Sequence, residues 1–169
     1  EWSCDLERKA ISALKSCPSQ SVSVPVGTTG FFYYRNHSTG GDPMDMWLSE
    51  INNTSIDLHE HPEAPVRCRG KNRNYCNLVR YDASRIGCAE NQCNGKKSTF
   101  CLTNRPPLLD EDVLYYWGEG ACPTGKCRPP TYGCNIDTGL CFEPVPTTTT
   151  TTTAKSIICH PLGCFGYPF

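Results

Sequence analysis

Residues 2–17 read WSCDLERKAISALKSC, and this stretch decides how the N-terminal part of the chain folds. Apolar or small residues recur there at helical spacing, at Leu6, Ala10, Ala13, Leu14 and Cys17. The charged residues at positions 7–9 would face solvent, and the proline at position 18 cannot continue a helix. The segment therefore predicts a helix over residues 5–16 with one buried stripe.

Cysteine content assigns the chain to a class of proteins. Of 169 residues 13 are cysteine, a share typical of disulfide scaffolds, whereas only 38% are hydrophobic. So many thiols fit an oxidising compartment, which argues against a cytosolic enzyme and predicts a secreted, extracellular protein. The odd number leaves one cysteine without an obvious partner in the chain. Because the first residue is Glu1 rather than methionine, we interpret the chain as a mature product or a fragment.

Charge and hydropathy exclude two classes of partner. The formal net charge of -1 gives no overall field that would attract nucleic acid or an anionic membrane. No apolar run approaches the roughly 20 residues of a transmembrane helix.

Acceptor motifs for N-linked glycans occur at Asn36, Asn52 and Asn53, which again fits the secretory route.

Five further segments indicate a mixed α+β domain that ends near Trp117. The aromatic residues 31–34 predict a strand or an aromatic-lined turn. Asp42 as a cap and Pro43 in the first turn predict a second helix that runs to Ile51. Short apolar runs at 76–81, 98–102 and 113–117 are bounded by turn formers and are typical of strands.

The C-terminal part divides into three pieces. Residues 118–142 hold four cysteines among glycine and proline, so disulfides rather than a core would stabilise this small module. Residues 143–156 are a linker rich in threonine and proline, of the kind that carries O-linked sugars or serves as a plain spacer. Residues 157–169 form a short tail with two cysteines and three aromatic rings, and we interpret it as the start of a further domain.

Several motifs together resemble one known family. The segment Trp2-Ser3-Cys4-Asp5-Leu6-Glu7, the later Arg85-Ile86-Gly87-Cys88, and Thr138-Gly139-Leu140-Cys141 are similar to segments of the CAP superfamily, in its nematode branch of SCP/TAPS or venom-allergen-like proteins. The resemblance covers residues 1–142 and is weak through 35–75. It implies a CAP-like α-β-α sandwich over residues 1–117 and a disulfide-rich hinge module over 118–142. The family's first helix would lie upstream of Glu1, so the sandwich would be incomplete at the N-terminus.

The resemblance also implies a disulfide pattern. It joins Cys4 to Cys93 and Cys88 to Cys101, and in the hinge Cys122 to Cys134 and Cys127 to Cys141. We also expect a local Cys68–Cys76 bridge. Cys17 is then left without a partner in the domain, and Cys159 and Cys164 are not assigned.

Many CAP proteins bind a divalent metal in a cleft of two histidines and two glutamates, and this chain departs from that set. Aligned on the family, Phe31 stands at a glutamate position and Asn74 at a histidine position, while Glu50 alone is retained. One ligand of four does not make a metal site, so we predict no metal and no cofactor. In this respect the chain resembles one branch of the family, the hookworm inhibitors of neutrophils and platelets, whose cleft is similarly degenerate.

Other ligand and catalytic patterns are weak. His59-Glu60-His61 offers two imidazoles but no third ligand, so a solvated loop is the better interpretation. Cys159, His160 and Cys164 are better explained by a disulfide than by zinc. No nucleophile elbow or phosphate-binding glycine loop occurs, and the sequence therefore supports no enzyme.

Two surface features are candidates for binding. In an extended chain Arg67, Arg69, Lys71 and Arg73 would project from one face and suit an anionic partner, although a solvated loop closed by Cys68 and Cys76 is the simpler explanation. The aromatic residues Phe31, Phe32, Tyr33 and Tyr34 could line a lipid groove, although strand core is the simpler explanation for them.

The leading hypothesis is a secreted parasitic-nematode effector that binds a host extracellular or cell-surface protein or glycan without catalysis. One alternative is a sterol or fatty-acid carrier that uses the aromatic segment. Another is an inhibitor of trypsin-like proteases that presents the loop 125–130, with Lys126 or Arg128 offered to the protease.

Overall fold

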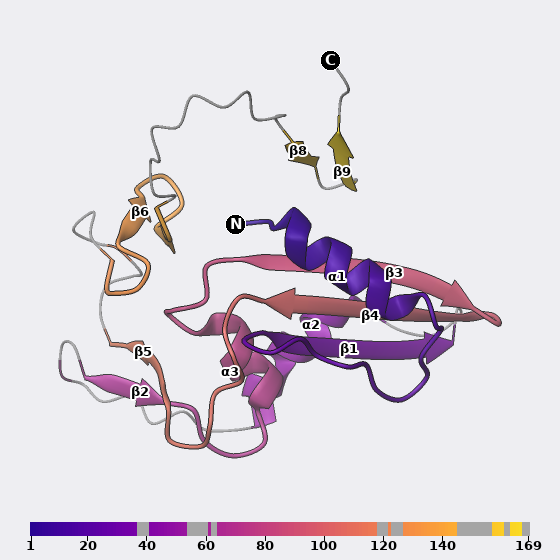
Figure 1. The fold of residues 1–169 in the computed structure, drawn as a ribbon. Coiled ribbons are helices and arrows are strands. Elements are labelled where there is room, and N and C mark those ends of the chain that lie inside the picture. Colours follow the sequence, from indigo (N-terminus) through magenta and orange to yellow (C-terminus); the bar gives the residue numbers. More distant parts are fainter. Residues whose placement is uncertain are drawn as a thin grey trace.

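The structure is a computed structural model, and it describes residues 1–36, 41–53, 61, 64–117, 122, 127–144, 157–160 and 163–166. Its centre is an antiparallel three-stranded sheet of order β1-β4-β3 (Figure 1). The strands are β1 (Thr29–Asn36), β3 (Ile86–Cys93) and β4 (Lys96–Thr103). Helices cover both faces of the sheet, and the protein is therefore an α-β-α sandwich.

Helix α1 (Cys4–Leu14) lies on one face of this sheet. Its buried stripe of Leu6, Ala10 and Leu14 packs against Phe100 and Leu102 of the sheet. The Ser3 hydroxyl caps the helix by accepting a hydrogen bond from the Leu6 backbone nitrogen. The helix predicted over residues 5–16 is therefore present, but it begins one residue earlier and ends two residues sooner.

The other face carries α2 (Pro43–Leu48), the 3-10 helix η1 (Ser49–Asn53) and α3 (Arg73–Val79). The Asp42 side chain caps α2 through the Met44 backbone nitrogen at 2.8 Å, as its sequence predicts. Residues 76–81, which we predicted as a strand, instead lie mostly in α3. That prediction was wrong. The buried or half-buried residues of this segment, Cys76, Asn77 and Val79, follow a helical spacing. The residues that they contact come from distant segments of the chain.

The alternation of β1 separates the aromatic residues that were predicted as one groove. Phe31 packs with Trp47 and Cys101 on the α2 face, and Tyr33 packs against the same cluster. Phe32 packs with Phe100 on the α1 face. Because successive side chains of a strand point to opposite faces, residues 31–34 do not line a single lipid groove.

Three two-stranded sheets complete the described structure. Strand β2 (Pro65–Arg67) pairs with β5 (Val113–Tyr116) and encloses a second core around Val66, Leu108 and Leu114. In the hinge, β6 (Gly133–Asn135) pairs with β7 (Leu140–Phe142), and near the C-terminus β8 (Ile157–His160) pairs with β9 (Gly163–Gly166). None of the described helices is long and apolar enough to cross a membrane. The division of the chain at 117, 142 and 156 stays a prediction.

The disulfides agree with the predicted pattern except at one bridge. The bridges Cys68–Cys76, Cys88–Cys101, Cys122–Cys134 and Cys127–Cys141 are present. The predicted Cys4–Cys93 bridge is wrong, because Cys93 pairs with Cys17, which we had left without a partner. Cys4 is itself disulfide-bonded.

The direction of α1 along β3 explains why Cys93 pairs with Cys17 and not with Cys4. The helix starts beside Ile86, where the Ser3 nitrogen donates to the Ile86 oxygen at 2.8 Å. It ends beside Asn91, whose side-chain nitrogen donates to the Leu14 oxygen at 2.9 Å. Seven residues of strand separate Ile86 from Cys93, about 23 Å at the usual rise. Cys4 is therefore at the wrong end of the helix to reach Cys93, whereas Cys17 is at the right end.

Candidate functional site

The structure brings together two of the three degenerate cleft positions. The Asn74 side-chain nitrogen donates to one oxygen of the Glu50 carboxylate at 2.6 Å. The backbone nitrogens of Asn74 and Tyr75 donate to the other oxygen at 2.8 and 3.1 Å. Asn72, the N-cap residue of α3, makes no side-chain cap bond, so Glu50 from η1 satisfies the first turn of α3 in its place.

Phe31, the third cleft position, fills space rather than binding a ligand. Its side chain is 1% exposed, and its ring centroid lies 5.5 Å from that of Trp47. The residue that we aligned with a glutamate of the family is therefore an apolar ring packed against α2. A cation at Glu50 would have to displace three N–H donors and would find no second carboxylate at position 31.

One cluster of three or more ligand side chains occurs among the described residues, and it lies in the hinge. The sulfur atoms of Cys122, Cys127 and Cys141 lie within 4.8 Å of one another. All three sulfurs are held in disulfides, so they offer no thiolate to a metal. Of the histidine pair, His61 is exposed, and His59 lies outside the described residues.

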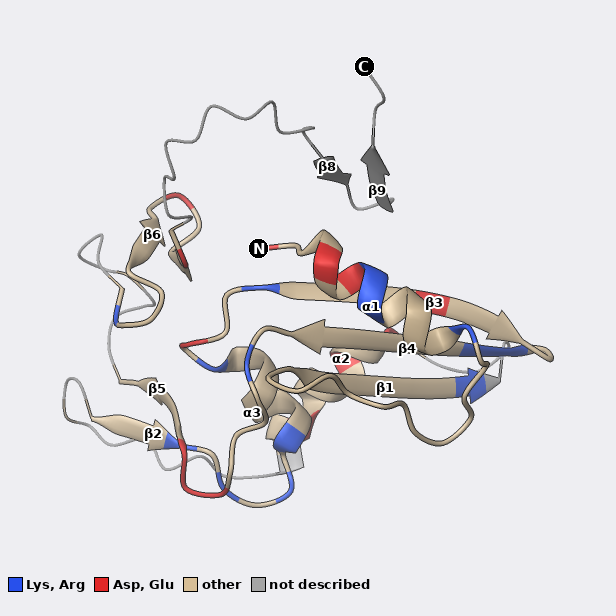
Figure 2. Ribbon diagram, in the orientation of Figure 1, with Lys and Arg blue, Asp and Glu red and all other residues tan. Residues whose placement is uncertain are grey.

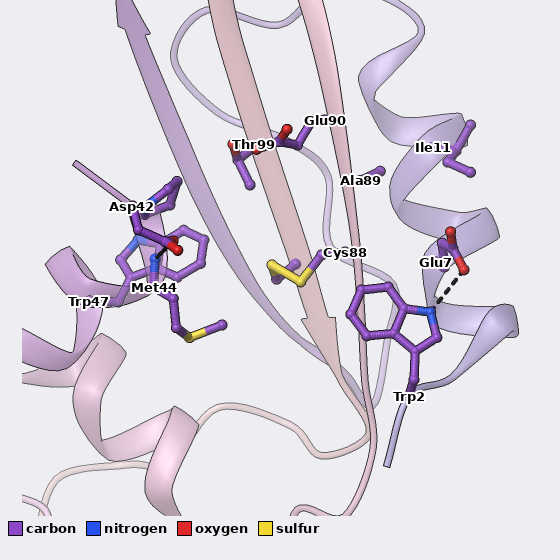
Figure 3. A pocket seen from close by; sticks show the side chains of 12 residues that line it. Trp2, Glu7, Ile11, Asp42, Met44, Trp47, Cys88, Ala89, Glu90 and Thr99 are labelled. Carbon is purple, nitrogen blue, oxygen red and sulfur yellow. Dashed lines mark hydrogen bonds between the residues drawn. A yellow bond between two sulfur atoms is a disulfide. The ribbon is translucent and has the colours of Figure 1, made fainter. Parts of the chain in front are cut away.

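A separate cavity of about 540 Å³ opens between α1, α2 and strands β3 and β4 (Figure 3). Its walls combine aromatic, aliphatic and acidic side chains, among them Trp2, Glu7, Ile11, Asp42, Trp47 and Glu90. The Trp2 indole nitrogen donates to the Glu7 carboxylate at 2.9 Å, so one acid and one ring are held together at the rim. The Cys88–Cys101 disulfide lies between the two sides of the cavity.

The polarity of this cavity limits what it can bind. Glu7, Asp42 and Glu90 contribute carboxylates, and the described residues of the wall include no lysine or arginine. Lys97 pairs with Glu90 at 2.6 Å from outside the lining. Acids beside indole rings suit a positively charged or aliphatic side chain, whereas the carboxylate of a fatty acid would be repelled. No local sequence pattern marks this site, because its walls come from segments that only the fold brings together.

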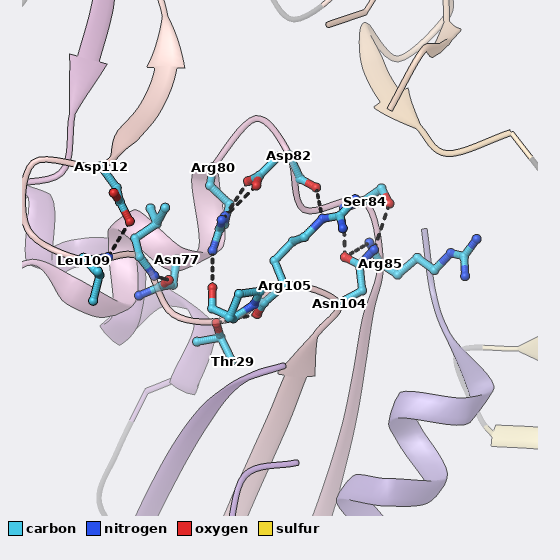
Figure 4. Close-up of polar contacts among 12 residues, drawn as sticks. Thr29, Asn77, Arg80, Asp82, Ser84, Arg85, Asn104, Arg105, Leu109 and Asp112 are labelled. Carbon is cyan, nitrogen blue, oxygen red and sulfur yellow. Dashed lines mark hydrogen bonds and ion pairs between the residues drawn. The ribbon is translucent and has the colours of Figure 1, made fainter. Parts of the chain in front are cut away.

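A second group of polar side chains surrounds the loop 80–85 of the domain (Figure 4). Arg80 is buried and forms an ion pair with Asp82, with nitrogen–oxygen distances of 2.5 and 2.8 Å. The Arg105 Nε donates to the Asp82 backbone oxygen at 2.9 Å, and its guanidinium forms an ion pair with Glu143, just after β7. These contacts satisfy buried charges and stabilise the loop 80–85, which is a structural role.

The hinge also contacts the domain through a guanidinium group that lies over a tyrosine ring. The guanidinium of Arg128 lies 4.0 Å from the centroid of the Tyr116 ring, which in turn lies 5.3 Å from that of Tyr81. Burial of the Tyr81 hydroxyl, together with the nearby Tyr116 and Asp82, raises its pKa above the ordinary value. Arg128 is thus placed against the domain, which disfavours it as a residue offered to a protease, and Lys126 lies outside the described residues.

Comparison with known proteins decides the family. The family model described as CAP, the cysteine-rich secretory protein family, matches residues 1–104. The chain belongs to the CAP family. Members of this family are typically secreted and are generally not enzymes.

Individual CAP relatives are distant. The mouse protein "Cysteine-rich secretory protein LCCL domain-containing 1" is 24% identical over 160 residues, which cover 84% of this chain and 31% of that protein. The chain therefore spans about a third of the length of this relative. The crystal structure of a hookworm platelet inhibitor superposes with a TM-score of 0.56 at 21% identity and covers 85% of this chain and 75% of that one. The structure titled NaASP2 with Zn2+ gives a TM-score of 0.61 at 18% identity, covering 83% and 74%.

The cationic residues predicted as an anion-binding face are separated in this CAP domain. Strand β2 ends at Arg67 and α3 begins at Arg73, so the four side chains do not share an extended face. Arg69 forms an ion pair with Glu111 at 2.7 Å, and Arg67 donates to the Glu111 backbone oxygen at 2.6 Å. Because residues 110–112 are all acidic and lie beside this loop, the predicted patch is largely neutralised.

The glycan acceptors lie at the ends of elements. Asn36 is the last residue of β1, and Asn52 is exposed in η1. Asn53 is the last residue of η1, and its side chain lies outside the described residues. Occupation of these sites stays a prediction.

Proposed function

We propose that this CAP protein is a secreted, non-enzymatic effector of a parasitic nematode that binds a protein on the surface of host cells. The observation that carries the proposal is the conversion of the family cleft. Phe31 packs on Trp47, and the Glu50 carboxylate caps α3, so the residues of a metal centre have become structural. The Cys88–Cys101 bridge that the family resemblance implies is present at the same time, and a Cys17–Cys93 bridge ties the end of α1 to β3.

Two further observations support binding rather than catalysis. The family is generally non-enzymatic, and a fold neighbour is named as a hookworm platelet inhibitor. We propose that the present chain acts by binding a protein on the surface of host cells.

The cavity beside Trp2 is the proposed contact site. Its rim exposes 40% of Trp2 and 47% of Ile11, although large apolar side chains are normally buried. Exposed tryptophan next to a concave surface is typical of residues that carry most of the energy of a protein interface. The acidic wall would receive a basic side chain of the partner.

The test is binding to intact mammalian platelets and leukocytes. Purified, fluorescently labelled protein with closed disulfides should bind in a saturable way, and trypsin treatment of the cells should remove that binding. Ile11→Glu adds a like charge beside Glu7, and we expect it to weaken binding about tenfold or more. The matched control is Val26→Glu, which changes a fully exposed valine outside the cavity and should leave binding unchanged.

Three results would contradict the proposal. These are the absence of saturable binding to both cell types, binding that survives trypsin treatment, and equal loss of binding in both variants. The last would show that added negative charge, rather than the cavity, controls binding.

A further inference from the structure

Basic residues lie close together at one end of the central sheet, where β1 ends and β4 begins (Figure 2). Arg35 lies near the end of β1, and Lys96 and Lys97 open β4. Lys15 directly follows α1, whose last turn lies beside Asn91 near the end of β3, so Lys15 joins them at the same end of the sheet. Residues 15, 35, 96 and 97 are called the cationic sheet end below.

Strand register and one disulfide assemble this end. Arg35 is directly opposite Lys97, and Cys93 is directly opposite Lys96. The Cys17–Cys93 bridge brings the chain after α1 to Cys93, so Lys15 lies near Lys96 although 81 positions separate them in sequence. Of these four residues, only Lys96 and Lys97 are adjacent in the sequence. The fold brings Lys15 and Arg35 to the same end of the sheet.

The cations at this end are only partly neutralised. Lys97 forms an ion pair with Glu90. Asp42, which comes after Arg35 in the sequence, uses its side chain to cap α2. Lys96 is exposed, with its Nζ 5.1 Å from the centroid of the Tyr34 ring, and Arg35 lies 6.0 Å from that of Tyr33. Like charges directly opposite each other destabilise a strand pair, so the Arg35–Lys97 pair is a cost to the fold.

This end differs from the loop that we first considered for anions. Beside Arg67–Arg73 lie three consecutive acids, and Arg69 is already held by Glu111. Among the described residues, the acids near the sheet end are Glu90 and Asp42, which are far apart in the chain, and α1 carries no acid after Glu7. An anionic partner therefore meets less competition at the sheet end.

We propose that the cationic sheet end binds a sulfated glycan chain. Lys96 and Lys97 point to opposite faces of the sheet, so the cations surround a convex tip made by the Asn94-Gly95 turn rather than line a cleft. An extended, flexible polyanion can follow such a tip and contact both faces. A folded acidic protein would need a matching concavity, and a membrane surface would meet cations on only one face at a time. The site is distinct from the cavity beside Trp2.

The test uses immobilised heparin as the sulfated polysaccharide and purified protein from which N-linked sugars have been removed, because Asn36 is directly opposite Lys96. We expect retention at low salt and release before about 1 M salt, where the screening length falls to about 3 Å. The double variant Lys15→Ala, Lys96→Ala should bind heparin about tenfold more weakly. The matched control Lys9→Ala, Lys71→Ala removes the same charge from exposed positions elsewhere and should bind like the unmodified protein.

Several outcomes would overturn the proposal, and none depends on host cells. No retention at low salt, or equal weakening in both double variants, would show that no specific site exists. Equal competition by polyglutamate would indicate an acidic protein, and equal binding to vesicles of anionic lipid would indicate a membrane surface. Thermal unfolding of each variant verifies that the change in binding is not a loss of fold.

Discussion

The Asn74 side-chain nitrogen lies 2.6 Å from the Glu50 carboxylate, and this contact holds the carboxylate at the start of α3. Both residues were aligned with metal ligands of the family, and the structure confirms that they are neighbours. Their contact satisfies N–H donors at the start of α3 instead of holding a cation.

Removal of the Glu50 charge should destabilise the domain. Glu50→Gln weakens three hydrogen bonds to a half-buried carboxylate, and we expect a loss of about 1 to 3 kcal/mol in the free energy of unfolding. Urea denaturation followed by circular dichroism measures it. Asp110→Asn, at an exposed acid, is the control and should change stability by less than about 0.5 kcal/mol. Equal stability of Glu50→Gln and the unmodified protein would show that the cap is not formed.

Zinc should not bind to the CAP cleft. Phe31 supplies an apolar ring, Asn74 a neutral amide, and only Glu50 an anionic oxygen, while stable zinc sites use three or four protein ligands. Isothermal titration at neutral pH should show no site tighter than about millimolar. The disulfides must be closed in this experiment, because reduction would free the clustered hinge thiols. A micromolar site that Glu50→Ala abolishes would refute the prediction.

Peptide mapping under non-reducing conditions should recover Cys17 linked to Cys93. The bridge closes a loop across 76 positions, so replacing both cysteines by alanine should lower stability by about 2 to 4 kcal/mol. Detection of a Cys4–Cys93 peptide would mean that α1 runs differently along β3.

Gly87 should tolerate no side chain. A Cβ atom there would lie 2.6 Å from the Ser3 oxygen and closer still to the Glu7 backbone nitrogen, so α1 would have to move away from β3. We expect Gly87→Ala to cost about 1 to 3 kcal/mol. Gly41→Ala, where a Cβ meets nothing within 4 Å, is the matched control in the same thermal unfolding assay.

Stability should fall at alkaline pH through Tyr81 and Tyr115. Burial raises the pKa of both hydroxyls in the folded protein, so above the ordinary pKa of about 10 the unfolded chain loses protons that the folded protein keeps. Their contribution is complete below pH 10 and is lost as the pH rises through the folded-state pKa values. Spectrophotometric titration of tyrosinate should show late ionisation, and Tyr81→Phe should remove part of it. Ionisation of all tyrosines at their ordinary pKa would contradict the burial.

Local sequence signals determined several features of this protein. The apolar spacing of residues 5–16 specified α1, Asp42 and Pro43 specified the start of α2, and cysteine content specified a disulfide-stabilised chain. These signals suffice because helical periodicity and capping depend on residues a few positions apart. The family motifs added the sandwich fold and the pairing of Cys88 with Cys101.

Only the tertiary structure decided which distant residues meet. The helical state of residues 73–79 depends on Glu50 and on packing against the β2–β5 region, and the Cys17–Cys93 bridge depends on the direction of α1 along β3. The cavity beside Trp2 and the cationic sheet end likewise combine segments that are far apart in the chain. The physical reason is that packing and strand register act between residues without a fixed sequence separation, so no local pattern encodes them.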